Sequence, residues 1–276
     1  MHTSFDWSKP VLIWWFCLSL VALFNIILWF ISYKLLKNFH KNKVLVFLSG
    51  LYVFGCAFRS FLPRADVQRL CIFDTWFSNV LLGRSVATMA ELAFIVQWAI
   101  VLNFLSRSSH SKKIQFVSYC IVPLIIVAEC FSWYAVITTN YLGNTVEESL
   151  WALTYLIIGL SLLNLLKSFH SLRMIMTIAA IGCFLYFLFM ISIDVPMYFN
   201  RWQADLIEQK PLMNFAQGIN DLNTRWVVSH STEEWRQEMP WMSLYFSVAV
   251  WVSIGLSWFP KLLSDINRQS DEKSVY

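Results

Sequence analysis

A guanidinium, a carboxylate and an indole follow one another at seven-residue spacing within a long apolar stretch. They are Arg84, Glu91 and Trp98, and residues seven apart lie on nearly the same face of a helix. An ionised carboxylate at the centre of a membrane helix costs about 3 kcal/mol on insertion scales, so it should face other helices, pair with a cation or take up a proton. Glu91 is therefore predicted to be a general acid or base, with Arg84 and Trp98 beside it in a binding site.

Two further acids lie within apolar stretches. Glu129 is part of AECFSWY, and Asp194 is part of SIDVPMYFNRW. If the helix continues beyond Asp194, Tyr198 and Arg201 follow on its face at i+4 and i+7. Either Glu129 or Asp194 is expected to be the acid–base counterpart of Glu91. Tyr198 and Arg201 are predicted to contribute to substrate binding.

The connection RSFLPRADVQRLCIFDTW is rich in charge. Its charged residues are Arg59, Arg64, Asp66, Arg69 and Asp74. Pro63 favours a short new helix here, and the planar guanidinium of arginine suits paired contacts with phosphate or carboxylate. Together with Arg84, these residues are predicted to hold the anionic head group of a substrate. The alternative is that the arginines and acids pair with one another and only hold the connection in place.

The elements that would position these residues are membrane helices. The chain is 58% apolar and only 14% charged, whereas about a quarter of an ordinary soluble domain is charged. A helix needs about 20 mainly apolar residues to cross a bilayer. Seven stretches meet this requirement, at about 10–33, 44–62, 80–105, 114–138, 146–166, 174–196 and 241–260. We therefore predict an all-α, polytopic membrane protein, with residues 1–276 forming a single seven-helix transmembrane domain.

The distribution of basic residues predicts an orientation. Lysines gather after the first, third and fifth stretches and in the C-terminal tail, for example Lys34, Lys112 and Lys261. Basic connections stay in the cytoplasm, so the N-terminus is expected outside and the C-terminus inside. The charged connection and the three acids would then lie in the outer half of the membrane. Which membrane this is does not follow from the sequence.

The long connection 197–240 is predicted to lie outside and to cover the site as a lid, or else to be a plain connector. In SHSTEEWRQEMPWM, Ser231 and Glu234 have the spacing of a capping box, so a short helix ending at Pro240 is expected. A second capping box, Thr145 with Glu148, predicts that the fifth helix begins near residue 146. Glu147 is then interpreted as a structural residue at a helix N-terminus.

The sequence contains one short repeat. LLKNFH at 35–40 resembles LLKSFH at 165–170. A parallel duplication of this kind is known in transporters. The alternative is coincidence between two cytoplasmic connections.

Several classes of site are disfavoured. Since no histidine lies within an apolar stretch, haem, di-iron and histidine–zinc sites in the helix bundle are not expected. We predict no metal site, identify no cofactor and find no basic surface for nucleic acid. The oligomeric state stays open.

These features lead to one preferred function and one alternative. We expect an enzyme, such as a transferase or cyclase, that acts on an anionic lipid or isoprenoid by carboxylate acid–base chemistry. The alternative is a transporter or ligand-binding protein that uses the same arginines and acids without chemistry. In both cases the partner is a membrane lipid or an amphiphilic small molecule.

Overall fold

The computed structural model describes residues 9–39 and 42–274, with side chains described up to residue 265. The protein is all-helical, with 83% of the structure in helices, as predicted. Within the described residues, seven helices are long and apolar enough to cross a membrane. They are Pro10–Leu36, Lys43–Phe61, Val80–Ser108, Lys112–Thr138, Tyr141–Leu165, His170–Ile207 and Glu238–Asp265. These helices are consistent with a multi-pass integral membrane protein.

The chain divides into two compact units. Unit 1 comprises residues up to 94 together with 215–258, and unit 2 comprises 95–214 together with the residues from 259 onward. Helix α3 (Val80–Ser108) and helix α11 (Val250–Ser274) are each divided between the two units. The two units are described in turn.

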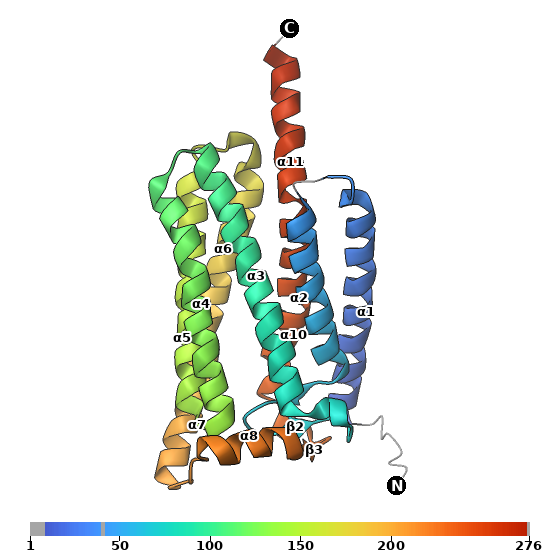
Figure 1. Cartoon of the computed structure of the whole chain (residues 1–276), viewed down its shortest axis with the longest axis vertical. Coiled ribbons are helices and arrows are strands. Elements are labelled where there is room, and N and C mark those ends of the chain that lie inside the picture. Colours follow the sequence, from blue (N-terminus) through green and yellow to red (C-terminus); the bar gives the residue numbers. More distant parts are fainter. Residues whose placement is uncertain (1–8, 40–41, 275–276) are drawn as a thin grey trace. The chain divides into compact units, whose positions relative to one another are not determined.

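Unit 1 begins with α1 (Pro10–Leu36) and α2 (Lys43–Phe61), which pack side by side in Figure 1. Indole and amide side chains tie α1 to the last helices of the chain. Trp14 donates to Ser243, Trp251 to Asn25, and Trp258 to Ser32, at 2.8–3.0 Å. These hydrogen bonds fix the rotation of α1 about its own axis, because buried polar groups need their partners.

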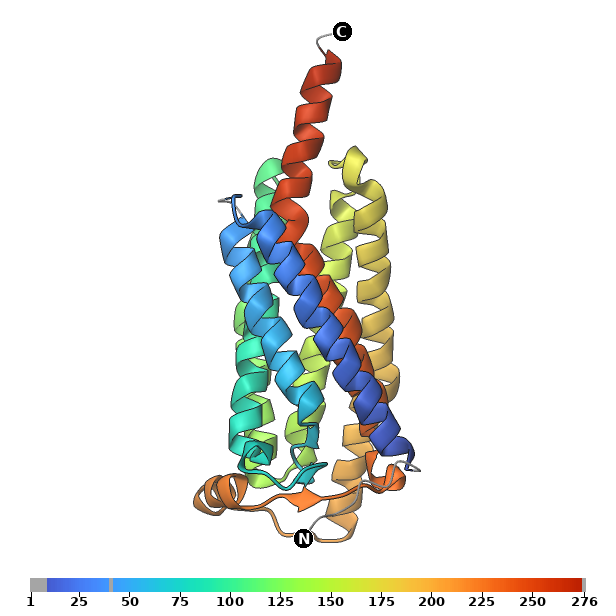
Figure 2. The same cartoon turned by 90° about the vertical axis from the view of Figure 1, so that its right-hand side faces the viewer.

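A widened turn gives α1 a further contact. Residues Tyr245–Ala249 form the π-helix η5 between α10 (Glu238–Leu244) and α11. A π turn loosens the normal backbone pattern, and Asn25 Nδ2 donates to the carbonyl of Phe246 at 3.0 Å. Figure 2 shows α1 beside this last helical segment. The amide of Asn25 therefore satisfies a backbone group at the irregular turn.

The charged connection between α2 and α3 is built from strands, which corrects the short helix predicted after Pro63. Strand β1 (Arg64–Ala65) pairs antiparallel with β2 (Leu70–Cys71), and a 3-10 turn at Trp76–Ser78 leads into α3. Arg69 has a φ of 61°, a left-handed conformation that closes the tight turn. The proline ends α2 but does not start a helix.

Residues 215–235 complete this end of unit 1. Helix α8 (Phe215–Thr224) leads to β3 (Val227–Val228), which pairs parallel with β2, and α9 (Thr232–Trp235) follows. The predicted capping box is wrong, because Ser231 makes no side-chain cap and Glu234 instead accepts from Ser229. Pro240 does not end a helix either, since it lies inside α10. We call this strand-bearing end, residues 59–79 with 215–238, the strand end.

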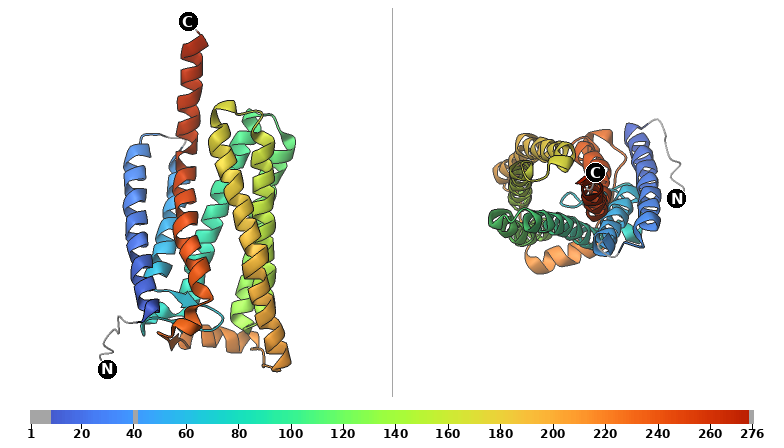
Figure 3. Two further views of the ribbon diagram at one scale, coloured as in Figure 1. Left: turned by 180° about the vertical axis from the view of Figure 1, so that it is seen from behind. Right: turned by 90° about the horizontal axis from the view of Figure 1, so that it is seen from above.

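Unit 2 is a series of antiparallel helices. Helix α4 (Lys112–Thr138) packs on α5 (Tyr141–Leu165), which packs on α6 (Arg173–Phe189), as Figure 3 shows from behind. A π-helix, Met190–Asp194, then leads into α7 (Val195–Ile207). Proline lacks the N–H that a helix interior needs, and the wide turn directly before Pro196 lets the helix continue past it.

Helix α5 begins earlier than predicted. Its N-cap is Asn140, whose side chain accepts from the backbone N–H of Leu142 at 3.0 Å. Thr145 is already inside the helix and donates to the Tyr141 carbonyl, so the predicted capping box with Glu148 is wrong. The earlier start places Asn144 and Glu147 within the helix, where both are buried.

Candidate functional sites

Two arginines share one carboxylate at the strand end of unit 1. Arg59 Nη1 lies 3.2 Å from Asp66 Oδ2, and Arg64 Nε lies 3.6 Å from Asp66 Oδ1. Arg59 also donates to the carbonyl of Arg64. Both guanidinium groups are buried, with 5% and 1% exposure. Two cations and one anion leave this cluster with a net charge of +1.

A second buried pair joins the two chain segments of the strand end. Arg69 Nε donates to Asp221 Oδ2 at 2.7 Å. Asn79 donates to Asn223, and Trp226 donates to Asp74 at 2.9 Å. Arg69 and Asp74 therefore lie in contacts that hold residues 215–235 against the α2–α3 connection.

Cys71 belongs to the same closed structure. Burial raises the pKa of its thiol above the usual range. The thiol therefore stays protonated, and it donates to the carbonyl of Phe73 at 3.3 Å. Because Cys71 is 1% exposed, the strand end excludes solvent at this point.

Glu91 forms an ion pair with Arg84 within α3. Arg84 Nη2 lies 2.8 Å from Glu91 Oε2, and both residues are buried. The seven-residue spacing noted in the sequence therefore brings these two side chains together. Trp98 is also buried, on the part of α3 that belongs to unit 2.

An apolar groove runs along unit 1 between helices. Its volume is about 410 Å³, and its lining is almost entirely apolar. It is lined by Trp29, Phe47, Gly50, Leu51, Phe54, Gly55, Phe58, Val86 and Met89. Gly50 is required here, since a Cβ would come within 2.8 Å of the Trp29 ring. The groove is therefore formed by the close approach of α1, α2 and α3.

Arg64 lies against Phe58, one of the residues that line this groove. Its guanidinium carbon lies 5.8 Å from the centre of the Phe58 ring, and its Nη2 fills the space where Gly83 lacks a side chain. Its Nη1 donates to the carbonyl of Asn79. Among the described residues, Nη2 has no hydrogen-bond partner. Burial lowers the pKa of Arg64 to about 10, despite the opposing charge of Asp66.

Unit 2 contains two carboxylates close together. Glu129 on α4 and Glu147 on α5 are 3% and 4% exposed, and an oxygen of one lies within 4.8 Å of an oxygen of the other. Asn144 Nδ2 donates to Glu147 Oε2 at 3.1 Å. Asn144 and Glu147 were not predicted as site residues, because the helix was expected to begin five residues too late. The buried stripe Asn144, Glu147, Trp151, Tyr155 and Ile158 was the available signal.

The remaining predicted site residues lie in unit 2. Asp194 is buried at the end of the π-helix. The guanidinium of Arg201 lies 5.5 Å from the Tyr198 ring and 5.6 Å from the Tyr141 ring. The two rings stack at 6.3 Å. Tyr198 and Arg201 thus form an aromatic–cation cluster with the start of α5.

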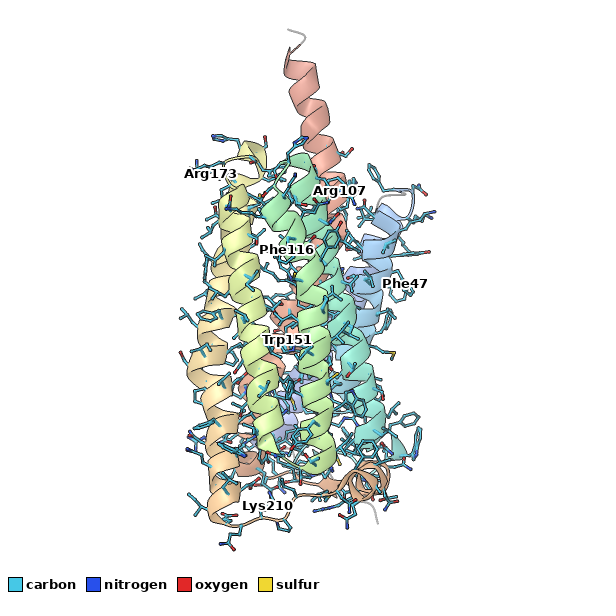
Figure 4. The ribbon with its side chains drawn as sticks, turned by 60° about the vertical axis from the view of Figure 1, so that its left-hand side comes forward. Phe47, Arg107, Phe116, Trp151, Arg173 and Lys210 are labelled. Atoms are coloured by element: carbon cyan, nitrogen blue, oxygen red, sulfur yellow. The ribbon has the colours of Figure 1, made fainter. Side chains whose placement is uncertain are left out.

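The side chains also show how basic residues are distributed in unit 2. In Figure 4, Arg107 and Arg173 lie at one end of the unit and Lys210 at the other. Lys210 is paired with Asp205 at 3.1 Å.

Comparison with known proteins identifies no relative. No known family matches the sequence, no curated protein is similar to it, and no solved structure matches it.

Proposed function

We propose that this chain is a multi-pass membrane protein that binds an anionic amphiphile in unit 1, with the tail in the apolar groove and the head group at Arg64. The N-terminus would lie outside and the C-terminus in the cytoplasm, which puts the strand end at the outer surface. The observation that carries the proposal is a buried guanidinium that lies against Phe58, a residue lining an apolar groove.

The groove suits an apolar tail. Its volume lies at the lower end of the range of about 300–1,000 Å³ that is usual for small-molecule sites. Phe47, Phe54 and Met89 line it and are between 42% and 64% exposed, so they would face lipid in a membrane. A lipid or isoprenoid chain could enter sideways from the bilayer without crossing a polar barrier.

The charge behind Phe58 suits an anionic head group. Arg59, Arg64 and Asp66 carry a net charge of +1, and Arg64 offers Nη2 as a further donor. A bound phosphate or carboxylate would balance this charge and satisfy the donor. Because Phe58 lies between the guanidinium and the groove, its ring has to turn aside when the head group binds.

Enzymatic activity is the second candidate function, after ligand binding. Glu91, the predicted acid or base, is 2.8 Å from Arg84 and 8% exposed. It would have to exchange this cation for a substrate before it could transfer a proton. Amphiphile binding or transport requires no such exchange.

Native mass spectrometry of the purified protein tests the proposal. We expect the wild type to carry an anionic amphiphile, and expect Arg64→Gln to lose it. Met89→Trp should also lose it, because an indole at this exposed lining position fills the groove. The matched controls are Arg225→Gln, an exposed arginine of the same unit, and Ile27→Trp, an exposed position on α1 outside the lining.

Each outcome decides the proposal. Loss in both site variants, with retention in both controls, supports it. If all five proteins carry the same lipids in the same amounts, the arginine cluster serves only to hold the strand end together. Loss of the amphiphile in Arg64→Gln alone would support the head-group site but would show that the tail binds outside the groove.

A further inference from the structure

We propose that unit 2 binds anionic phospholipids at the end where α4 and α6 begin. We call this surface the basic end, because it carries five cations: Arg107, Lys112 and Lys113 where α3 turns into α4, and Lys167 and Arg173 where α5 turns into α6. The proposal rests on the membrane orientation proposed above, which puts both connections in the cytoplasm. It does not rest on amphiphile binding in unit 1.

The two connections lie at one end of the unit. Helix α5 packs antiparallel against both α4 and α6, so these two helices begin where α5 ends. Figure 4 shows Arg107 and Arg173 at this end and Lys210 at the other. All five cations are exposed, and so are His110 and His170 in the same two connections. The basic end is therefore one surface with two segments of the chain.

Carboxylates are distant from this surface. Residues 92–128 and 149–193 contain no Asp or Glu. Within the described part of the chain, none of the five cations forms an ion pair. On α11, Asp265 follows Lys261 at i+4, so this helix adds no net charge with its described side chains. The basic end thus presents five positive charges that an anion can neutralise.

Exposed apolar side chains lie directly beside these charges. Phe116, which Figure 4 shows below Arg107, is 69% exposed, and Met174 is 73% exposed. Both belong to segments long and apolar enough to cross a membrane. The hydroxyl group of Tyr119, whose ring is 57% exposed, lies close to Arg107, as expected of a tyrosine at the membrane interface. A free phosphate ion would use only the charges, whereas a phospholipid uses the charges and the apolar side chains together.

The number and location of the cations fit the inner leaflet. Clusters of four to eight Lys or Arg residues at the cytoplasmic end of a membrane helix attract anionic lipids, and each cation raises the affinity about fivefold. The five cations of the basic end fall in this range. Guanidinium and ammonium groups both bind the phosphate of a head group. The proposed orientation places them next to the leaflet that carries the anionic lipids.

Native mass spectrometry of the purified protein in detergent tests the surface. The probes are phosphatidylserine and phosphatidylcholine with identical acyl chains. We expect the wild type to prefer phosphatidylserine, and expect this preference to fall as NaCl is added. Two variants each remove the cations of one connection, Arg107→Gln/Lys112→Gln/Lys113→Gln and Lys167→Gln/Arg173→Gln. Each should lower the affinity for phosphatidylserine, about fivefold for each charge removed, and leave that for phosphatidylcholine unchanged.

The matched control is Lys210→Gln, which removes an exposed lysine from the other end of unit 2 and should keep the wild-type affinity. Circular dichroism checks the fold of each variant. Cross-linking locates the bound lipid, because a photoactivatable phosphatidylserine should label peptides that contain Phe116 or Met174. Arg64→Gln should leave this labelling unchanged, which separates the basic end from the site in unit 1. Neither readout depends on orientation, so a failure of the orientation and a failure of the surface are distinguishable.

Three results would overturn the surface. The first is equal affinity of the wild type for the two lipids. The second is a loss of affinity in Lys210→Gln as large as in Lys167→Gln/Arg173→Gln, which would mean that only the total charge matters. The third is displacement of phosphatidylserine by inorganic phosphate where NaCl of the same ionic strength has no effect, which would mean that the surface binds free phosphate instead.

Discussion

The strand end of unit 1 and the acid pair of unit 2, Glu129 with Glu147, both bury charge, but they draw on different stretches of the chain. At the strand end, each of Arg59, Arg64 and Arg69 lies within 4 Å of a carboxylate. In unit 2, Glu129 and Glu147 come from consecutive helices, and an oxygen of one lies within 4.8 Å of an oxygen of the other.

The comparison also shows where each arrangement gains its stability. The strand end joins residues that are about 150 positions apart in the chain, such as Arg69 and Asp221. Its ion pairs hold the long connection after α7 against the α2–α3 connection. The acid pair joins consecutive helices, which already pack without it. The strand end therefore fixes long-range contacts of the fold, whereas the acid pair lies between two adjacent helices.

The largest expected effect comes from opening the strand end. Asp221→Ala leaves the buried guanidinium of Arg69 without its carboxylate, and should lower the free energy of unfolding by about 3–5 kcal/mol. Thermal unfolding in detergent measures this loss. Arg225→Ala removes only the exposed partner of Asp221 and should cost less than about 1 kcal/mol. Equal effects of the two variants would mean that the buried pair is not a structural contact.

The next effect compares the same substitution in a buried and in an exposed ion pair. Glu91→Gln weakens the buried ion pair with Arg84 and should lower the free energy of unfolding by about 2 kcal/mol. Glu233→Gln weakens only the exposed pair with Arg236 and should change that free energy little. The unfolding midpoint should therefore fall in the first variant and stay nearly constant in the second. A similar loss in both variants would mean that burial does not strengthen the Arg84–Glu91 contact.

The smallest effect tests the position of the acid pair along α5. Asn140→Ala removes the N-cap contact to Leu142 and should cost about 1 kcal/mol. Thr145→Ala removes a hydroxyl inside the helix and should change the unfolding free energy by less than about 0.5 kcal/mol. The reverse order of the two effects would support a helix start near residue 146, with Glu147 outside the buried face.

The helical fold could be predicted because long apolar runs are a local property of the sequence. The partners of the charged residues could not, because they depend on distant segments. The Arg84–Glu91 pair follows from helical spacing, but nothing near Arg69 points to Asp221. The start of α5 was misplaced because Thr145 and Glu148 match a capping box as well as Asn140 matches an N-cap. This five-residue error concealed Asn144 and Glu147.

The π-helix at Tyr245–Ala249 has a consequence for how sequence length can vary in this protein. A π turn holds one residue more than an α turn, so deleting a residue there would restore a regular helix. The remainder of that helix would then rotate by about 100°. Trp251 and Trp258 would both turn away from Asn25 and Ser32, their acceptors on α1. We therefore expect the number of residues in this turn to be as strictly constrained as the identity of the tryptophans that follow it.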